Sequence, residues 1–395
     1  MTTHRQDFAV LRNNPDMTYL DCAATTFMPD SVVEAWVKFQ EECGVSLNRG
    51  GGFLSCRATE AFESASSRIL SYFGCGEEYE IAYTKNATES SNLFASVVEE
   101  RIGAGDVILV SPYEHHSNIL PWKRVAERRG ASIVEVAAKE DGSLDYDFLY
   151  GIDPRRIKVI TVSLVSNLTS HRVDAEKVKR LASDSGALLV YDVSQAAGHL
   201  AMDFRAMGAD AYFMSAHKMY GPKNVGAIVI RKDLCDELPP FLLGGGMVWD
   251  SQTGNPKWLG GGRKYLAGTF DIGLVSAWAE SCRYVEDIGK AQIECFEREV
   301  YQHAKSRFSG IPAVECVKDG GSSSCSLLSF VVDGVHPHDL EQMLAGRKVV
   351  LRTGHLCAQD ALRNLGYESV LRISWGIGSS CSDVDRVAEI IEEAI

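Results

Sequence analysis

Between residues 81 and 230 the sequence alternates short apolar runs with amphipathic stretches, and this alternation restricts the possible folds more than any other feature. The amphipathic stretches have helical spacing, as in residues 174–185, where Val178, Leu181 and Ala182 recur on one side. The apolar runs have the length and composition of strands that are buried on both faces. They are residues 81–84, 107–111, 133–136, 159–164, 187–192, 212–215 and 227–230. The pattern predicts an α/β fold with a mostly parallel, seven-stranded sheet covered by helices.

The pattern changes after about Val275. Residues 276–308 predict one long helix without a strong breaker before Gly310, and residues 383–394 predict a last helix. Strand-like runs at 327–332, 349–351 and 370–374 lie between them. We expect a large domain over residues 23–275, and a smaller α+β domain formed by residues 1–22 and 276–395.

Three glycine-rich stretches interrupt this pattern, at residues 50–52, 244–246 and 260–262. We interpret them as active-site loops, with ordinary surface turns as the alternative.

Charge and cysteine content exclude several classes of protein. The 40 Lys and Arg residues against 53 Asp and Glu give a net charge of −13, which disfavours a nucleic-acid binder or a polybasic membrane anchor. The 11 cysteines are odd in number and include no C-x-x-C pair, which disfavours zinc sites and a secreted disulfide framework. We therefore predict no metal site and reduced thiols.

The N-terminal segment and the longest apolar runs bear on the cellular compartment of the protein. The first residues carry charges where a signal peptide would be apolar, and no apolar run approaches the roughly 20 residues that span a bilayer. We expect a soluble, cytoplasmic protein.

In a parallel sheet, functional side chains gather beyond the carboxyl ends of the strands. Lys218 follows the run 212–215, close to Ser215 and His217. A lysine beside a buried strand can be a nucleophile, although most lysines are solvated surface charges.

Asp192 ends the run 187–192 and Gln195 follows three residues later. A helix cap is the simpler interpretation of Asp192 alone. A lysine and an aspartate on adjacent strands are, however, what pyridoxal phosphate (PLP) requires.

Other strand ends carry residues that suit the same cofactor. The run 81–84 leads into a helix start that contains Ala87 and Thr88, where backbone amides favour phosphate, although a simple capping box is the alternative. His115 follows the run 107–111 and could stack on a cofactor ring. Asn167 follows the run 159–164 and could bond a cofactor hydroxyl.

With these pieces assembled, the chain resembles the class V aminotransferase superfamily of fold-type I PLP enzymes, and most closely the group II cysteine desulfurases and selenocysteine lyases. The resemblance covers nearly the whole chain. The motifs that carry it are YLDCAATT from Tyr19, EHHSNILPW, VSN, YDVSQ, SAHKMYGP, AGT, RTGHLCAQ, LRISWG and SDVDRV.

The resemblance implies a role for each matching residue. Lys218 would carry PLP as a Schiff base and move the Cα proton, His115 would stack on the ring, and Asp192 would pair with the pyridine nitrogen. Arg372 would bind the substrate carboxylate, together with Arg352 and Ala24. Gln195 and Asn167 would bond the phenolic oxygen, and the phosphate would be held by Ala87, Thr88, Ser215, His217 and, from the neighbouring subunit of a homodimer, Thr269.

Cys357 matches the nucleophilic cysteine of the family. Taken alone it is one cysteine among 11, and a cysteine is by default a small buried hydrophobe. Its loop also carries Arg352 and His355, however, and nearby cations favour the reactive thiolate. The short Arg-Thr-Gly-His-x-Cys spacing resembles group II rather than group I.

The implied reaction is PLP-dependent desulfuration of L-cysteine to L-alanine. Cys357 attacks the substrate sulfur and keeps it as a persulfide, which passes to a sulfur-acceptor protein. Selenocysteine lyase, a C–S lyase or another class V reaction are alternatives, and a non-catalytic scaffold is a third. The pathway supplied, which includes iron–sulfur clusters among its candidates, stays open.

Four positions depart from the family pattern and put substrate preference and sulfur acceptor in doubt. Gly52 stands where the subgroup usually has a histidine, in Arg-Gly-x-His, and Leu356 where a second histidine is common. Leu266 replaces a usual glutamate and Phe270 a usual proline.

Overall fold

The centre of the protein is a seven-stranded sheet with the strand order β2-β10-β9-β8-β7-β3-β4. The structure is a computed structural model and describes residues 4–47, 52–251, 254–321 and 326–395. Only β10 runs antiparallel to its neighbours, so the prediction of a mostly parallel, seven-stranded sheet is confirmed. The strands are β2 (Tyr79–Thr84), β3 (Val107–Val110), β4 (Ser132–Glu135), β7 (Ile157–Ser163), β8 (Leu188–Asp192), β9 (Ala211–Ser215) and β10 (Gly226–Arg231).

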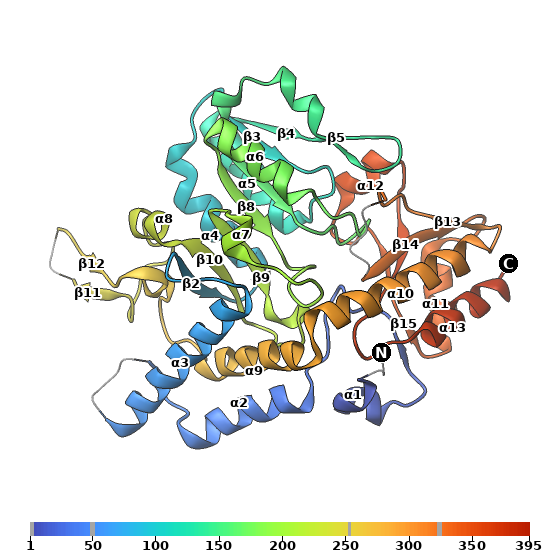
Figure 1. Cartoon of the computed structure of the whole chain (residues 1–395), viewed down its shortest axis with the longest axis horizontal. Helices are drawn as coiled ribbons and strands as arrows, with labels where there is room; N and C mark the ends of the chain where they lie inside the picture. Colours follow the sequence, from blue (N-terminus) through green and yellow to red (C-terminus); the bar gives the residue numbers. More distant parts are fainter. Residues whose placement is uncertain (1–3, 48–51, 252–253, 322–325) are drawn as a thin grey trace.

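Helices cover both faces of this sheet, as Figure 1 shows. Because successive side chains of a strand point to opposite faces, neighbours such as Tyr212 and Phe213 enter different cores. Phe213 packs in a cluster with Phe94 of α4 and Trp122 of α5. Tyr212 belongs to the cluster on the opposite face. The helices that follow or precede these strands are α3 (Phe53–Tyr72), α4 (Ala87–Val98), α5 (His116–Arg129), α6 (Ala175–Ser185), α7 (Phe204–Met207) and α8 (Lys232–Glu237).

A second, four-stranded antiparallel sheet has the order β13-β14-β17-β16. Its core contains Phe330 and Trp375, and α10, α11 and α13 pack around it. This smaller α+β part agrees with the prediction for the C-terminal region. Its elements are β13 (Val314–Cys316), β14 (Leu327–Val332), α11 (Pro337–Gly346), β16 (Arg352–Gly354), α12 (Gln359–Leu365), β17 (Val370–Ser374) and α13 (Cys381–Glu392).

The N-terminal segment lies against the smaller sheet rather than the large one. After α1 (Ala9–Asn13), strand β1 (Thr18–Tyr19) pairs in parallel with β15 (Val349–Val350), and Asp21 forms a bridge with Ser374 of β17. The predicted strand 349–351 therefore exists as β15, but it pairs with the N-terminal segment, and β16 is the strand that joins the smaller sheet. The division into domains at residues 22/23 and 275/276 stays a prediction.

The prediction of one long helix over 276–308 is wrong. Two helices occupy this region, α9 (Ile272–Ile288) and α10 (Lys290–Ser309), and Gly289 separates them. Gly289 has φ +100°, a conformation that side-chain-bearing residues rarely adopt, so the chain turns there. The helical periodicity of the sequence continues across this single glycine and conceals the break. Helix α9 packs on α3 and on α2 (Asp30–Glu42).

Among the described glycines of the three stretches, none lines the main cavity of this chain, so their interpretation as active-site loops stays a prediction. Gly262 approaches the Ile81 carbonyl so closely that a Cβ atom would overlap it, so this glycine serves packing against β2. Gly246 lines a separate small cavity, next to the hairpin β11 (Val248–Asp250) and β12 (Lys257–Trp258). Gly52 precedes α3, while residues 50 and 51 lie outside the described residues.

Two minor features complete the description. Strands β5 (Ala137–Ala138) and β6 (Leu144–Asp145) form a short hairpin. Within the described ranges, none of the helices combines the length and apolar character needed to cross a membrane.

Candidate active site

A cavity of about 310 Å³ opens where the carboxyl ends of the large sheet meet β16 and β17. All of the residues predicted for the site except Thr269 line it. They are Ala24, Ala87, Thr88, His115, Asn167, Asp192, Gln195, Ser215, His217, Lys218, Arg352, Cys357 and Arg372. Thr269 lines a different, smaller cavity together with Leu266 and Phe270, so its expected contribution to a neighbouring subunit's site stays a prediction.

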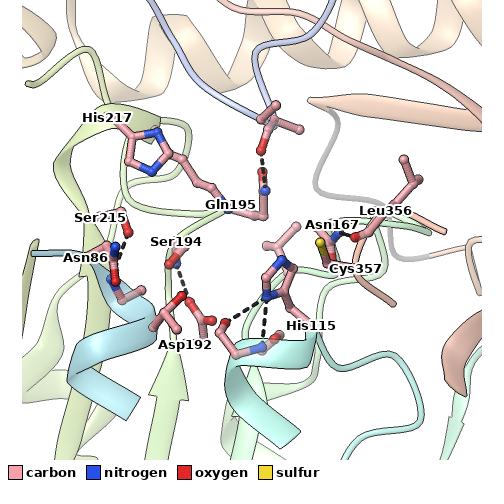
Figure 2. Close-up of a pocket in the computed structure, with 18 of the residues that line it drawn as sticks. Asn86, His115, Asn167, Asp192, Ser194, Gln195, Ser215, His217, Leu356 and Cys357 are labelled. Atoms are coloured by element: carbon pink, nitrogen blue, oxygen red, sulfur yellow. Dashed lines mark hydrogen bonds between the residues drawn. The ribbon is translucent and has the colours of Figure 1, made fainter. Parts of the chain in front are cut away.

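Asp192 is fixed at the carboxyl end of β8, one strand from Lys218. Its Oδ1 accepts a hydrogen bond from the Ser194 amide at 2.9 Å, which orients the carboxylate (Figure 2). Gln195 donates from Nε2 to the Ala23 carbonyl at 2.8 Å. Gln195 Oε1 and Ser194 Oγ are buried without a hydrogen-bond partner among the described residues. Buried polar atoms of this kind normally have partners, which indicates that a polar ligand completes this wall.

Lys218 ends a single 3-10 turn, Ala216–Lys218, directly after β9. Burial lowers the pKa of its ammonium, and the Asp192 carboxylate opposes this shift. A lowered pKa increases the fraction of neutral amine, which is the nucleophilic form. Gly198 allows this packing, because a Cβ atom there would lie 2.8 Å from Met219 Cα.

The first turn of α4 forms a corner of the cavity that Lys218 also lines. The first amides of a helix have no partner within the helix. Here the Ala87 amide donates to Ser215 Oγ at 2.8 Å, and the Glu89 amide donates to the Asn86 side chain at 3.0 Å. Thr88 lines the cavity with its amide at the positive end of the helix dipole. The capping interaction expected as an alternative is therefore present, and it coexists with a cavity-facing helix start.

His217 closes the other side of this corner. Its Nδ1 lies 3.2 Å from Thr25 Oγ1, and its backbone carbonyl accepts from the Thr26 amide at 2.8 Å. Burial and the nearby Lys218 charge lower the pKa of His217 to about 4. It is therefore a neutral imidazole at physiological pH.

The protonation state of His115 follows from its hydrogen bonds. Its Nδ1 accepts from the Ser117 amide at 3.1 Å and lies 2.7 Å from Ser117 Oγ (Figure 2). Because a backbone amide can only donate, Nδ1 is unprotonated and the ring proton is on Nε2. Burial and the Lys218 charge lower the pKa of His115 to about 3. The ring is therefore neutral and can donate one proton from Nε2.

The Glu114 carboxylate below His115 is fully buried and accepts from Ser111, Asn118 and Ser163 at 2.6 to 2.8 Å. Burial still raises the pKa of Glu114. This carboxylate joins β3, α5 and β7 beneath the cavity.

The loop that carries Cys357 has an unusual backbone. Leu356 and Cys357 have φ angles of 52° and 54°, in the left-handed region that side-chain-bearing residues seldom occupy. Two hydrogen bonds hold it, from Asn167 Nδ2 to the Leu356 carbonyl at 2.8 Å and from the His116 amide to the Cys357 carbonyl at 2.7 Å. Asn167 was predicted to bond the cofactor, and its side chain is a clamp on this loop. Leu356 is buried in the core, whereas Cys357 is exposed.

Other cysteines of the described chain differ from Cys357 in their surroundings. Burial raises the pKa of Cys22 above its usual range and the pKa values of Cys75 and Cys235 to about 12. These thiols stay protonated and unreactive. Cys357 combines exposure with a place in the cavity beside Lys218 and Arg372.

Arg372 and Arg352 form the cationic end of the cavity. Arg372 is buried on β17, and its Nη1 donates to the Asn167 carbonyl at 2.8 Å. Both guanidinium groups also contact the buried carboxylate of Asp21. Two cations near one cavity suit a ligand with a carboxylate.

The cavity residues fit PLP. A helix start with Thr88 and Ser215 suits the phosphate, and Asp192 suits the pyridine nitrogen. Lys218 suits the aldehyde carbon, and His115 lies on the same wall. The unpartnered Gln195 Oε1 supports the fit, because it needs a polar partner from outside the chain.

Three further residues support the site, although their local sequence does not predict their contacts. Asp21 contacts Arg352 and Arg372, Ser117 contacts His115, and the His116 amide donates to the Cys357 carbonyl. Asp21 lies within the YLDCAATT motif, which was the available signal. Ser117 and His116 follow His115 directly, but only the structure shows their contacts.

The departures from the family pattern lie in different surroundings. Leu356 lines the cavity and replaces a titratable side chain by an apolar one. Phe270 packs on Tyr83, with ring centroids 5.7 Å apart, close to Leu266 and away from Lys218. Residues 49–51 of the Arg-Gly-Gly-Gly stretch are not among the described residues.

Comparison with known proteins extends over nearly the whole chain. Residues 18–387 match the family described as Aminotransferase class-V. The "Probable cysteine desulfurase" of Vibrio cholerae is 32% identical over 98% of this chain and 95% of its own length. The "Probable cysteine desulfurase 2" of Mycobacterium leprae is 33% identical over 99% and 96%.

Solved structures give the same result. The apo cysteine desulfurase from Thermococcus onnurineus superposes with a TM-score of 0.94 at 30% identity, covering 100% of this chain and 98% of that one. The cysteine desulfurase CsdA of Escherichia coli, in its S-sulfonic acid form, gives a TM-score of 0.90 at 29% identity, covering 99% and 97%.

Proposed function

This chain is a cysteine desulfurase of the class-V aminotransferase family, and on that premise we propose that it takes the sulfur of L-cysteine onto Cys357 and releases L-alanine. The observation that carries the proposal is that Lys218, Arg372 and Cys357 line one cavity, although they lie far apart in the sequence. An amine, a carboxylate-binding cation and a thiol within one cavity are the groups that this reaction needs.

PLP is the cofactor in this proposal. Lys218 would hold it covalently, Thr88, Ser215 and His217 would bind its phosphate, and Asp192 would pair with its ring nitrogen. When bound, the cofactor supplies an electron sink for the substrate Cα.

Arg372 and Arg352 would bind the substrate. Arg372 would bind the α-carboxylate of L-cysteine, with Arg352 beside it and Ala24 at the cavity edge. A bidentate guanidinium–carboxylate pair fixes orientation as well as charge. The substrate sulfur would then face the Cys357 loop.

Two residues would move protons. Lys218, whose pKa is lowered by burial, would remove the Cα proton of the substrate. His115 would donate a proton from Nε2, since its Nδ1 is occupied by Ser117. His115 is neutral at physiological pH, and the lowered pKa of Lys218 increases the fraction of its amine that can accept a proton.

Cys357 would perform the sulfur step as a thiolate. Its sulfur attacks the substrate Sγ, a sulfur–sulfur bond forms, and the substrate Cβ–Sγ bond breaks with its electron pair left on carbon. The carbon fragment takes up protons and leaves as L-alanine, and Cys357 is left as a persulfide. Because Cys357 is exposed, a sulfur-acceptor protein could reach it.

The remaining features of the proposal concern the assembly. We propose a cytoplasmic homodimer in which Thr269 reaches the phosphate of the partner subunit's site. Reduced thiols would be needed to keep Cys357 available.

Replacing Cys357 by Ala tests the proposal, with Cys295→Ala as the matched control because Cys295 is exposed on α10. Holoenzyme is given L-cysteine or L-selenocysteine, and alanine is measured. We expect Cys357→Ala to keep its cofactor absorption band and to lose at least about 100-fold in alanine formation from L-cysteine. Undiminished alanine formation would overturn the persulfide role. Wild-type enzyme that forms alanine from L-selenocysteine but not from L-cysteine would identify a selenocysteine lyase.

A further inference from the structure

Arg352 and Arg372 are direct partners in the register of β16 and β17. Partners in an antiparallel pair project from the same face, with their Cβ atoms about 5 Å apart. Both side chains line the cavity. Like charges placed directly opposite each other repel, so this pair needs an anion beside it.

Asp21 supplies that anion. Its Oδ2 accepts from Arg352 Nη2 at 2.7 Å and from Arg352 Nε at 3.2 Å, and its Oδ1 accepts from Arg372 Nη2 at 3.3 Å. The Asp21 side chain is only 6% exposed and does not line the cavity. It therefore acts from behind the two guanidinium groups and would not touch a ligand.

The position of Asp21 is fixed by backbone contacts. Asp21 bridges in parallel with Ser374, and the Cys22 amide donates to the Ser374 carbonyl at 3.2 Å. The Ala23 amide donates to Ser374 Oγ at 2.9 Å. The Asp21 backbone is thus held against β17, the strand that carries Arg372.

The net charge of Arg352, Arg372 and Asp21 can be neutralised by one further carboxylate. Two guanidinium groups and one Asp21 carboxylate carry a net charge of +1. Arg372 Nε is buried and has no hydrogen-bond partner among the described residues. One monoanionic carboxylate at Arg372 would neutralise the group and satisfy that donor. Without Asp21 the net charge would be +2, which suits a dianion better.

We propose that Asp21 is a positioning residue that sets the cavity to accept a single carboxylate: it fixes both guanidinium groups and cancels one of their charges. This inference rests on the proposed function, because it assigns the carboxylate of the amino-acid substrate to Arg372. It adds a determinant of substrate selectivity, mono- against dicarboxylate-type amino acids, from a residue outside the cavity.

The test compares Asp21→Asn holoenzyme with wild type and with Asp16→Asn. Asp16 is the matched control because it lies on the same segment and pairs with Lys348 at 3.2 Å on the surface. The probes are L-alanine, which has one carboxylate and no sulfur, and L-cysteate, which adds a sulfonate. Their dissociation constants are measured by calorimetry and by changes in the cofactor absorption band.

We expect Asp21→Asn to bind L-alanine about 10- to 100-fold more weakly, because a charged hydrogen-bond partner of the arginines is lost. L-Cysteate should be weakened less, so that the preference shifts towards the dianion. Asp16→Asn should match wild type. Folded Asp21→Asn that binds both probes as wild type does would overturn the inference.

A second variant covers the case in which Asp21→Asn does not fold. Asp21→Glu keeps the charge, so the ratio of the two dissociation constants should stay that of wild type even where both become weaker. A shift of this ratio towards L-cysteate would overturn the inference. Wild-type enzyme that binds neither probe would overturn the proposed function together with this inference, whereas equal binding by wild type and Asp21→Asn overturns the inference alone.

Discussion

The two walls of the cavity are built in different ways. The strand-end wall consists of Asp192, Lys218, His115 and the α4 start, and each lies at the carboxyl end of a strand of the large sheet or within five residues after it. The small-sheet wall consists of Arg352, Leu356, Cys357 and Arg372, with Asp21 behind the arginines. The first wall is set by one sheet, whereas the second depends on contacts such as that between Asp21 and Arg372, which lie 351 positions apart in the chain.

The backbone conformation also differs between the two walls. The strand-end wall ends ordinary strands and begins ordinary helices. The small-sheet wall holds two consecutive left-handed residues, each of which costs about 1–2 kcal/mol in a chain of L-residues. Such strain persists where surrounding contacts enforce it, here Asn167 and the His116 amide. The residues of the strand-end wall are therefore positioned by the large sheet, whereas Cys357 is positioned by a few specific hydrogen bonds.

Removing Lys218 should produce the largest effect, because it disables the strand-end wall. In Lys218→Ala we expect loss of the cofactor absorption band that borohydride bleaches and at least about a 1,000-fold loss of alanine formation. Absorption spectra and product analysis measure both. Lys223→Ala is the control, since Lys223 is exposed nearby. Substantial alanine formation by Lys218→Ala would show that Lys218 of the strand-end wall is not needed for the reaction.

Removing the Asn167 side chain should affect the small-sheet wall selectively. Asn167→Ala loses the hydrogen bond to the Leu356 carbonyl, and we expect about a tenfold slower formation of the Cys357 persulfide. The cofactor band should remain. Rapid-mix sampling of the persulfide gives the rate, and Asn364→Ala, which removes an exposed amide, is the control. An unchanged rate of persulfide formation would show that the Cys357 loop keeps its conformation without the Asn167 hydrogen bond.

His115 offers a test of the strand-end wall by pH. Its pKa of about 3 lies below the usual 6.5, so the folded protein binds fewer protons than the unfolded chain between these values. Stability contributed by neutral His115 is therefore present above about pH 6.5 and is lost as pH falls from there towards 3. In ¹⁵N spectra of the imidazole we expect a neutral Nε2–H ring that does not titrate between pH 5 and 8. Titration near 6.5 would contradict the assigned state.

Gly289 provides the smallest expected effect and a reference for backbone strain. Gly289 adopts a φ of +100° without the steric strain that a side chain would cause, whereas the left-handed residues Leu356 and Cys357 carry side chains. Gly289→Ala should lower the free energy of unfolding by about 1–3 kcal/mol and leave activity of the folded enzyme unchanged. Denaturant titration and steady-state assays measure the two quantities. A large loss of activity at full stability would show that the α9–α10 junction also shapes the cavity.

The strand-end wall was largely predictable from the sequence. Buried parallel strands have a recognisable composition, and the rule that sites lie beyond their carboxyl ends brought Asp192 and Lys218 together. The place of Thr88 at the cavity follows from the same rule, because α4 begins shortly after β2.

The small-sheet wall was predictable only through the family resemblance. Cys357 and Arg372 matched motifs, but nothing in the local sequence predicts that Asp21 bridges two arginines or that Asn167 holds the Leu356 carbonyl. These contacts join segments that are distant along the chain. The helix break at Gly289 was missed for the opposite reason, since periodicity on both sides of one glycine outweighed it.

We propose that Cys357 receives the substrate sulfur in the cavity that Lys218 and Arg372 share. The direct measurement mixes holoenzyme with L-cysteine in the absence of reductant and acceptor, then determines the mass of the Cys357 peptide after alkylation. We predict that this peptide, and not that of the exposed Cys295, gains the mass of one sulfur atom in step with one equivalent of L-alanine. L-Alanine formed in that first turnover while the Cys357 peptide stays unmodified would contradict the claim.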